Sequence, residues 1–295
     1  MAEYVLTGCT AADLTEEVFH DRDIPYVCFH FELGGRDYLD DLGKTVPPAE
    51  LYRRMESGEL TKTSQVSVGA YEEFFAGILR TGKDILHVTL SSGISGTVNS
   101  ARIAAEDLKS EFPDRRIIIV DGLGASSGYG LLLTLMADQR DAGLTIDELR
   151  DWAEANKLHV QHWFFSTDLT YYIRGGRVTK TAGFVGQLLN ICPLLNVDSQ
   201  GKLIPREKIR GKKAVIRRTV EKMEEHAENG TAYDGRVYIS HSECLEDAQA
   251  MAQMIEERFP ATKGKITIFN IGATIGSHTG PGTVALFFYG NERTL

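Results

Sequence analysis

The chain has 295 residues, of which 42% are hydrophobic and 25% charged, and its formal net charge is −9 at pH 7. This length and apolar content suffice for one large α/β domain or two domains with buried cores, and they exclude an intrinsically disordered chain. The negative charge argues against nucleic acid as the main partner, because DNA and RNA attract a broad positive surface. With no signal-like N-terminus and no apolar run of membrane-spanning length, we expect a soluble, cytoplasmic protein without stable membrane insertion.

The first part of the chain alternates apolar runs with helical periodicities. A double proline starts one short helix, and a hydroxyl-rich run precedes an amphipathic one. The elements expected here are, in chain order, strand 4–7, helix 11–19, strand 26–31, a turn-rich stretch 34–43, a helix from Pro47 to Ser57, a polar loop 61–67 and a helix around residues 71–79.

The stretch from Ile85 to Leu108 predicts a buried strand over 85–90, a Ser/Gly loop over 91–97 and a helix with apolar residues at helical spacing. Free N–H groups and the positive end of the helix dipole meet in such a loop, and its glycines let the backbone approach a ligand closely. The loop therefore suits an anion. The alternative is that Thr97 is only a helix N-cap and that the serines are ordinary loop residues.

A second all-apolar strand, 116–121, is followed by a glycine-rich turn and a leucine-rich helix, and Thr145 with Glu148 forms a capping box for a helix ending at Asn156. Strands and helices thus alternate at the spacing of βαβ units. This pattern predicts a doubly wound, mostly parallel sheet that binds ligands at the carboxyl ends of its strands.

The pattern changes from His159, so we place a domain boundary at 158 and expect an N-terminal α/β domain over 1–158 and a C-terminal α/β domain over 159–295. The elements expected after the boundary are strand 160–166, helix 169–173, helix 182–191, a hairpin over 193–204, helix 212–228, strand 237–240, helix 245–259, strand 265–271, a glycine-rich loop 272–283 and strand 284–289.

Two groups of residues outside the central loop could carry chemistry. His278 lies among glycines in the closing loop, where a displayed imidazole can titrate or donate near neutral pH. Arg174 and Arg177 flank a glycine turn, and further basic residues, Arg210 among them, follow in the next segment; such a patch suits a phosphate or an acidic partner surface. A solvated face balanced by glutamates is the alternative.

One enzymatic pattern competes with the binding hypothesis. Residues 124–128, Gly-Ala-Ser-Ser-Gly, match the nucleophile motif of α/β-hydrolases, and Ser126, Asp198 and His278 occur in the hydrolase order. Against a serine hydrolase acting on lipid esters, Asp121, Gly122 and Leu123 come between the apolar strand residues and the motif, and no HGGG-type loop precedes it. Metal-ligand motifs, a Walker A motif and a dinucleotide fingerprint are also missing, so we expect no metal and no cofactor.

Four separate motifs, in order and at the expected spacing, resemble the DegV family, which includes the fatty-acid-binding subunits of bacterial fatty acid kinase. They are Thr63-Ser-Gln65, Leu90-Ser-Ser-Gly-Ile-Ser-Gly-Thr97, Gly175-Gly-Arg177 and His278-Thr-Gly-Pro-Gly-Thr283. The resemblance implies a fold of two α/β domains with a long-chain fatty acid bound between them. It also implies a carrier without catalytic machinery of its own, which presents the carboxylate to a separate ATP-dependent kinase for acyl-phosphate formation and makes at most transient contact with a membrane surface.

Carried over by motif, the residues implied to hold the carboxylate are Thr63, Ser64, Ser92, Gly93, His278 and Thr279. Arg177 matches by motif as a contact for the kinase, with Arg174 and Arg210 as further candidates. The acyl chain needs an apolar tunnel, since each buried methylene contributes roughly 0.8 kcal/mol. Candidates for its wall are Phe184, Leu188, Ile191 and Leu194. One departure concerns the first strand, where the family usually has Thr-Asp-Ser-Thr and this chain has Gly8 and Cys9 in place of the Asp and the Ser.

Overall fold

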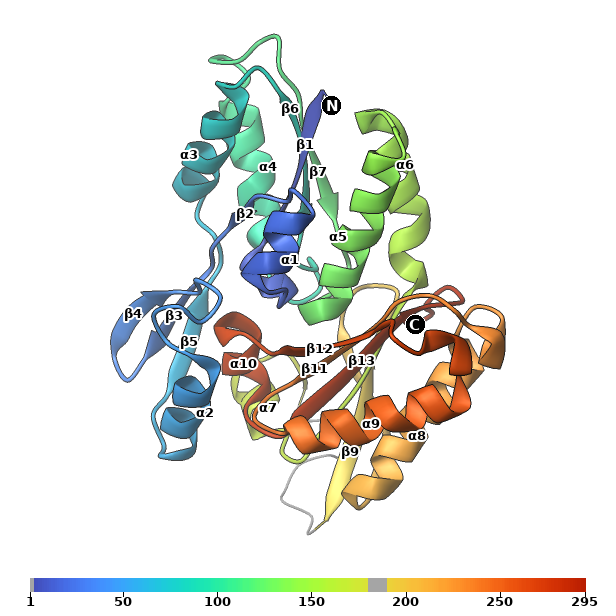
Figure 1. Cartoon of the computed structure of the whole chain (residues 1–295). Helices are drawn as coiled ribbons and strands as arrows, with labels where there is room; N and C mark the ends of the chain where they lie inside the picture. The colour runs from blue at the N-terminus through green and yellow to red at the C-terminus, as the bar shows by residue number, and fades with distance from the viewer. Residues whose placement is uncertain (1–2, 180–189) are drawn as a thin grey trace.

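A four-stranded parallel sheet forms the centre of the N-terminal half in the computed structural model, which describes residues 3–179 and 190–295. Its strand order is β2-β1-β6-β7, and β1 pairs in parallel with both β2 and β6. Helices α3 and α4 lie on one face and α5 and α6 on the other (Figure 1). The bounds are β1 Tyr4–Cys9, β2 Tyr26–Val27, β6 Asp84–Thr89, β7 Ile117–Asp121, α3 Val68–Leu79, α4 Thr97–Asp107, α5 Ser126–Asp141 and α6 Ile146–Asn156. This confirms the expected parallel α/β layer, and the capping box of Thr145 and Glu148 begins α6.

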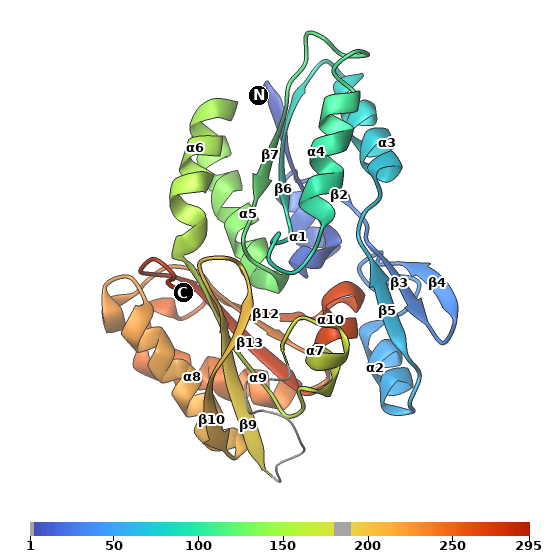
Figure 2. The same cartoon turned by 180° about the vertical axis from the view of Figure 1, so that it is seen from behind.

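A six-stranded mixed sheet forms the C-terminal half, in the order β10-β9-β8-β13-β11-β12. One face packs on α8 and α9, and the other faces the N-terminal half. Its strands are antiparallel except for the β11–β12 pair. The bounds are β8 Val160–Ser166, β9 Ile191–Val197, β10 Leu203–Arg210, β11 Val237–His241, β12 Ile266–Asn270, β13 Thr283–Tyr289, α7 Thr170–Arg174, α8 Lys212–His226 and α9 Leu245–Arg258. The expected hairpin is present as β9 and β10, and its turn reaches up to the loop after β6 (Figure 2).

A small antiparallel sheet, β4-β3-β5, was not expected from the sequence. The predicted single strand 26–31 divides into β2 and β3 (His30–Leu33), and β3 turns back as β4 (Arg36–Leu39) within the stretch expected to be only turns. The predicted loop 61–67 begins as β5 (Thr61–Ser64), in which Thr63 pairs with Phe31. A run of hydroxyl residues predicts a loop when only the local sequence is considered. Here the pairing with a distant strand decides their conformation. Helix α2 (Pro48–Glu56), which was expected, packs against this sheet through a small separate core.

Two predictions were wrong: one long helix near the N-terminus, and a loop near the C-terminus. The helix expected over 11–19 is a 3-10 turn, η1 (Thr10–Ala12), which ends at Asp13 in the left-handed conformation (φ 48°), followed by α1 (Glu16–Asp21) with Thr15 as its N-cap. The closing segment 272–283, expected to be a loop because of its glycines, contains the helix α10 (Ala273–Thr279). Glycine lowers helix propensity by only about 1 kcal/mol, and tertiary contacts exceed that here. The helix expected over 182–191 lies outside the described residues except for its end, where Ile191 belongs to β9.

The two halves share one hydrophobic core, because the largest cluster of buried residues includes side chains from both sheets. Asp138 on α5 forms ion pairs with Arg22 and with Arg236, and so joins the halves at the seam. The parallel sheet uses strands before residue 122 and the mixed sheet strands after residue 159; the division at 158 stays a prediction. Within the described part of the chain, no helix has the length and apolar character needed to cross a membrane.

Candidate functional site

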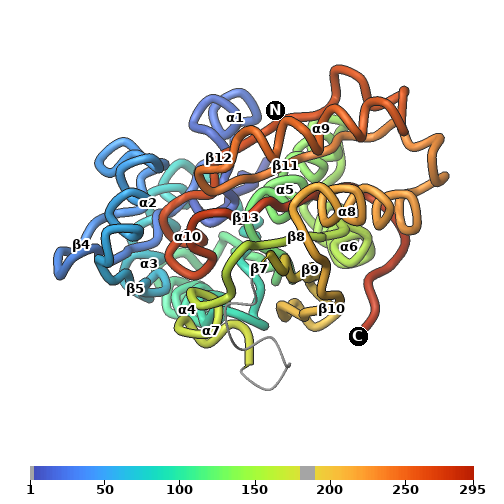
Figure 3. Tube along the Cα trace, turned by 90° about the horizontal axis from the view of Figure 1, so that it is seen from below, coloured from blue at the N-terminus to red at the C-terminus, as the bar shows by residue number. Residues whose placement is uncertain are grey.

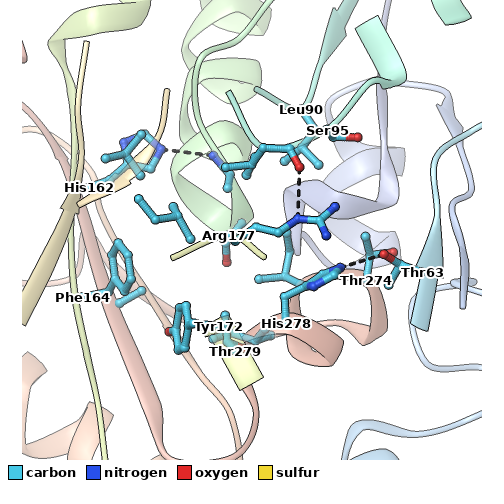
Figure 4. A pocket seen from close by; sticks show the side chains of 18 of the residues that line it. Thr63, Leu90, Ser95, His162, Phe164, Tyr172, Arg177, Thr274, His278 and Thr279 are labelled. Carbon is cyan, nitrogen blue, oxygen red and sulfur yellow. Dashed lines mark hydrogen bonds between the residues drawn. The ribbon is translucent and has the colours of Figure 1, made fainter. Parts of the chain in front are cut away.

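A cavity of about 230 Å³ lies at the seam between the two halves. Its wall combines the loop after β6, the start of α5, the inner face of the mixed sheet, β5 and α10, and Figure 4 shows polar side chains gathered towards one end. The lining residues are Phe29, Thr63, Gln65, Leu90, Ile94, Ser95, Gly96, Ala125, Ser126, His162, Phe164, Tyr172, Arg177, Val197, Leu203, Ile271, Thr274, Ile275, His278, Thr279, Thr283, Ala285 and Phe287.

Thr63 and His278 meet at the polar end of the cavity, which we call the head end. Thr63 Oγ1 on β5 and His278 Nε2 on α10 lie 2.7 Å apart, although 215 positions separate them in the chain. Helix α10 lies between the small sheet and the mixed sheet (Figure 3), and its contacts with β3 and β5 bring His278 next to Thr63. The structure thus brings together two of the residues that the sequence proposed as carboxylate ligands.

The surroundings of His278 keep its imidazole neutral. Its Nδ1 is buried without a hydrogen-bond partner among the described residues, and an added Cβ at Gly175 would come within 2.3 Å of that atom, so Gly175 is a position that admits no larger residue. Burial, with the positive charge of Arg177 as a second cause, lowers the pKa of His278 to about 4. A neutral imidazole beside an arginine is ready to accept or donate a hydrogen bond without adding charge.

Arg177 lies at the same end of the cavity as His278 (Figure 4). Its Nε donates to the carbonyl of Ile94 at 3.1 Å and its Nη1 to the carbonyl of Gly175 at 2.6 Å. Among the ion pairs of the described residues none involves Arg177, and burial lowers the pKa of its guanidinium. A half-buried cation held by carbonyls and lacking a carboxylate favours an anionic ligand.

The Ser/Gly loop contributes to the cavity through different residues from those expected. Ser92 is exposed and its N–H donates to Asp121, while Gly93 packs on the backbone of Gln200 and Gly201. Ser95 and Gly96, directly before α4, line the cavity instead. Ile94 of the same loop also lines the cavity. The turn of the β9–β10 hairpin covers the earlier part of the loop, where Ser91 Oγ donates to the Gly201 carbonyl.

Strand alternation accounts for two further placements. On β5, Thr61 and Thr63 are half-buried whereas Lys62 and Ser64 are exposed, so Ser64 points away from Thr63. On β9, Val197 lines the cavity, while Leu194 belongs to the opposite face and packs in the core under α8 and α9. Side chains alternate between the two faces of a strand, so this alternation identifies the residues that face the cavity once the position of the strand in its sheet is known.

The remainder of the cavity wall is mainly apolar. Phe164 on β8 and Phe287 on β13 face inward together with Leu90 and Val197. His162, also in this wall, donates from Nδ1 to the carbonyl of Val160 and accepts from the Ala125 N–H at Nε2, and burial holds its pKa well below the usual range. Ile191, half-buried on β9, is not among the lining residues, and Phe184 and Leu188 lie outside the described residues.

The serine hydrolase arrangement is not assembled. Ser126 lines the cavity with a left-handed backbone (φ 53°), but its hydroxyl donates to Asp13. Asp198 accepts backbone N–H groups of its own hairpin turn, from Gln200 and Lys202 at 2.9 Å each, and His278 contacts Thr63. The three proposed triad members therefore have three separate partners.

Gly8 and Cys9, where the chain departs from the family pattern, lie in the core of β1 and do not line the cavity. A Cβ at Gly8 would come within 2.7 Å of Leu133 Cδ1 and 2.9 Å of Tyr129 Oη, and the N–H of Cys9 donates to Tyr129 Oη. The space that an Asp side chain would need is filled by α5. Glycine and cysteine at these two positions thus allow β1 and α5 to pack closely.

The three basic partner candidates separate in the structure. Arg177 lines the cavity, whereas Arg174, at the end of α7, and Arg210, at the end of β10, are exposed. The guanidinium of Arg174 lies 5.6 Å from the ring centroid of Tyr171, at cation–π distance. No group of three or more potential metal ligands occurs in the described ranges 3–179 and 190–295.

The fold and the site together define an α/β protein with a parallel and a mixed sheet and, at the seam between its two halves, a mainly apolar cavity that has one polar end. The model of the DegV family, described as uncharacterised protein, DegV family COG1307, matches residues 8–291, and the chain belongs to this family. A DegV domain-containing protein of Clostridium perfringens is 36% identical over 293 residues, covering 99% of both chains.

Two solved structures from Thermotoga maritima share the fold. One, described as a DegV lipid binding protein, is 27% identical with a TM-score of 0.85, and the match covers 100% of both chains. The other, a hypothetical protein whose structure is said to reveal fatty acid binding function, is 25% identical with a TM-score of 0.81, and the match covers 99% of this chain and 100% of that one.

We expect the imidazole of His278 to stay neutral throughout the range from pH 5.5 to 8 in the ligand-free protein, because its pKa is lowered to about 4. Histidine side-chain NMR, with a His278→Asn variant to assign the signal, measures the titration. A carboxylate bound beside the ring should move the midpoint upward, since a negative charge favours the imidazolium. A midpoint near 6.5 in the free protein would contradict the burial of this ring.

Proposed function

We propose that this protein binds a long-chain fatty acid, with the carboxylate at the head end and the acyl chain along the apolar wall. The observation that carries the proposal is the joining of the Thr63–His278 pair and the half-buried Arg177 to an otherwise mainly apolar cavity. The lipid and fatty acid binding named for the two Thermotoga proteins supports it.

The physical chemistry of such a ligand fits this wall. Each methylene removed from water contributes roughly 0.8 kcal/mol, so a long chain supplies most of the affinity without any polar contact. The carboxylate must in turn be compensated, because burying an unpaired charge is costly. Thr63, His278 and the Ser95–Gly96 corner provide hydrogen-bonding groups, and Arg177 provides the positive charge. Thr279 Oγ1, buried without a partner among the described residues, is a further candidate donor.

We also propose that the protein acts in the cytoplasm as a carrier that presents the carboxylate to a separate ATP-dependent kinase. Two residues that line the cavity, Gln65 directly after β5 and Gly96 directly before α4, are exposed, which supports an opening of the cavity at the surface there. The exposed Arg174 and Arg210 are candidates for contacting the kinase. The carrier requires no nucleophile of its own, in keeping with the separate partners of Ser126 and His278.

Purified protein should contain fatty acid in near-stoichiometric amount or take it up from solution. Mass spectrometry of the extract from denatured protein measures the bound lipid, and isothermal titration after delipidation measures uptake. Absence of lipid together with no uptake of acids of 14 to 20 carbons, about the range whose methylenes could supply micromolar binding, would refute the proposal.

Ser95→Ala should weaken binding of the fatty acid by about 1–3 kcal/mol, since the carboxylate loses a donor and remains partly unsatisfied. Ser92→Ala is the matched control: it removes the same hydroxyl from the same loop at an exposed position, and its affinity should equal that of the original chain. The reverse ranking, measured by displacement of a fluorescent fatty acid, would return the carboxylate contact to Ser92 and overturn the placement at Ser95.

A fluorophosphonate probe should not label Ser126, because its hydroxyl donates to a buried carboxylate, and the two cavity-lining histidines, His162 and His278, have other hydrogen-bond partners. Intact-mass spectrometry after incubation detects the adduct, with a known serine esterase as positive control. Stoichiometric labelling that disappears in Ser126→Ala would favour the lipid-ester hydrolase instead.

A further inference from the structure

The helix α10 carries His278 but has no N-terminal cap of its own. Its N-cap residue is Gly272, which has no side chain to accept a hydrogen bond. The first N–H groups of a helix lack intrahelical partners and need acceptors from elsewhere. In this protein the acceptors come from the N-terminal half of the chain, more than 230 residues away.

Two buried aspartates supply these acceptors. Asp13 Oδ1 accepts the N–H of Gly272 at 2.9 Å, and Asp40 Oδ2 accepts both the N–H and the hydroxyl of Thr274, at 3.0 and 2.5 Å. Asp40 is only 2% exposed, and its own N–H is fixed to the carbonyl of Phe29, a cavity-lining residue. Asp40 therefore links the wall of the cavity to the start of α10.

The link to Asp40 fixes the side of α10 that the cavity uses. Thr274 and His278 are four residues apart, so they lie on the same face of the helix one turn from each other, and both line the cavity. A shift or rotation at Thr274 is therefore passed on to His278. Its Nε2 must stay within hydrogen-bond distance of Thr63, which belongs to a different sheet, and a displacement of about 1 Å breaks such a contact.

A buried carboxylate is an expensive cap. Burial raises the pKa of both Asp40 and Asp13, although the hydrogen bonds from α10 work against the rise. A serine or asparagine at position 272 would cap the helix locally at much lower cost, but it would not tie the helix to the other half of the molecule. The arrangement thus favours fixed placement of the helix over the simplest way of stabilising it.

We propose that Asp40 is a positioning residue for head-group recognition: by holding Thr274 it fixes α10 so that His278 meets Thr63 and the ligand carboxylate. This inference rests on the proposed fatty acid binding. It assigns Asp40 no contact with the ligand, and it makes recognition of the carboxylate, rather than of the acyl chain, depend on a residue outside the head end.

The test compares a 16-carbon fatty acid with the alcohol of the same length, both displacing a fluorescent fatty acid from the full chain. Asp40→Ala should lower the affinity for the acid about tenfold or more and leave that for the alcohol within about twofold, because only the acid uses the positioned head end. Asp40→Asn should recover most of the affinity, since its amide oxygen can still accept the N–H of Thr274.

Asp41→Ala is the matched control, because Asp41 is the neighbouring acid and accepts hydrogen bonds from Thr45 in a local turn. Its acid-to-alcohol ratio should equal that of the original chain. Equal losses for acid and alcohol in Asp40→Ala, or no loss for either, would overturn the positioning role.

A second measurement distinguishes failure of this inference from failure of the proposed function. It also tests the inference if Asp40→Ala does not fold. In ligand-free protein, the ring nitrogen signals of His278 should shift in the milder Thr274→Val variant, which loses the hydroxyl bond to Asp40, and stay unchanged in Asp41→Ala. An unchanged His278 signal in Thr274→Val would refute the positioning role even where fatty acid binds. Failure of the original chain to bind fatty acid, with the shift present, would instead refute the proposed function and keep the structural link.

Discussion

The hydrogen bond between Thr63 and His278 is the contact on which the organisation of the site depends. It joins the small sheet β4-β3-β5 to α10, and neither belongs to the parallel sheet that the sequence makes most obvious. For the two side chains to meet, β5 must pair with β3 in the observed register and α10 must sit between two sheets. The contact therefore reports on the packing of both halves of the molecule.

Electrostatics explains why this end of the cavity suits an anion. His278 is kept neutral by burial, and Arg177 is held by two backbone carbonyls without an ion-pair partner in the described residues. A protein that buries a cation in this way leaves a favourable interaction for a ligand to complete. Asp13 and Asp40, the buried aspartates next to α10, form no ion pair with Arg177 in the described part of the chain. Their oxygens accept hydrogen bonds from Gly272, Thr274 and Ser126, and burial raises the pKa of both carboxyl groups.

The comparison of sequence and structure is most instructive at Ser92 and Ser95. Both belong to the loop that the glycines and hydroxyls correctly marked as special, and both are serines after a buried strand. The loop, however, is covered at Gly93 by the hairpin turn of the other half and lines the cavity only from Ile94 to Gly96. The same holds for Leu194 on β9, which packs in the core and not on the cavity. Both faces of this strand are covered, so the sequence shows apolar residues on both and does not distinguish them.

The sequence by itself determined the apolar strands of the parallel sheet, the capped helix α6, the hairpin β9–β10 and the family motifs, because these depend on local propensity and on side-chain periodicity. Only the tertiary structure decided that Thr61–Ser64 is a strand, that residues 273–279 form a helix, and that Asp40 caps it. These features depend on partners up to 259 positions away, and a local pattern contains no information about which distant group will satisfy a backbone N–H or which face a neighbouring sheet will cover.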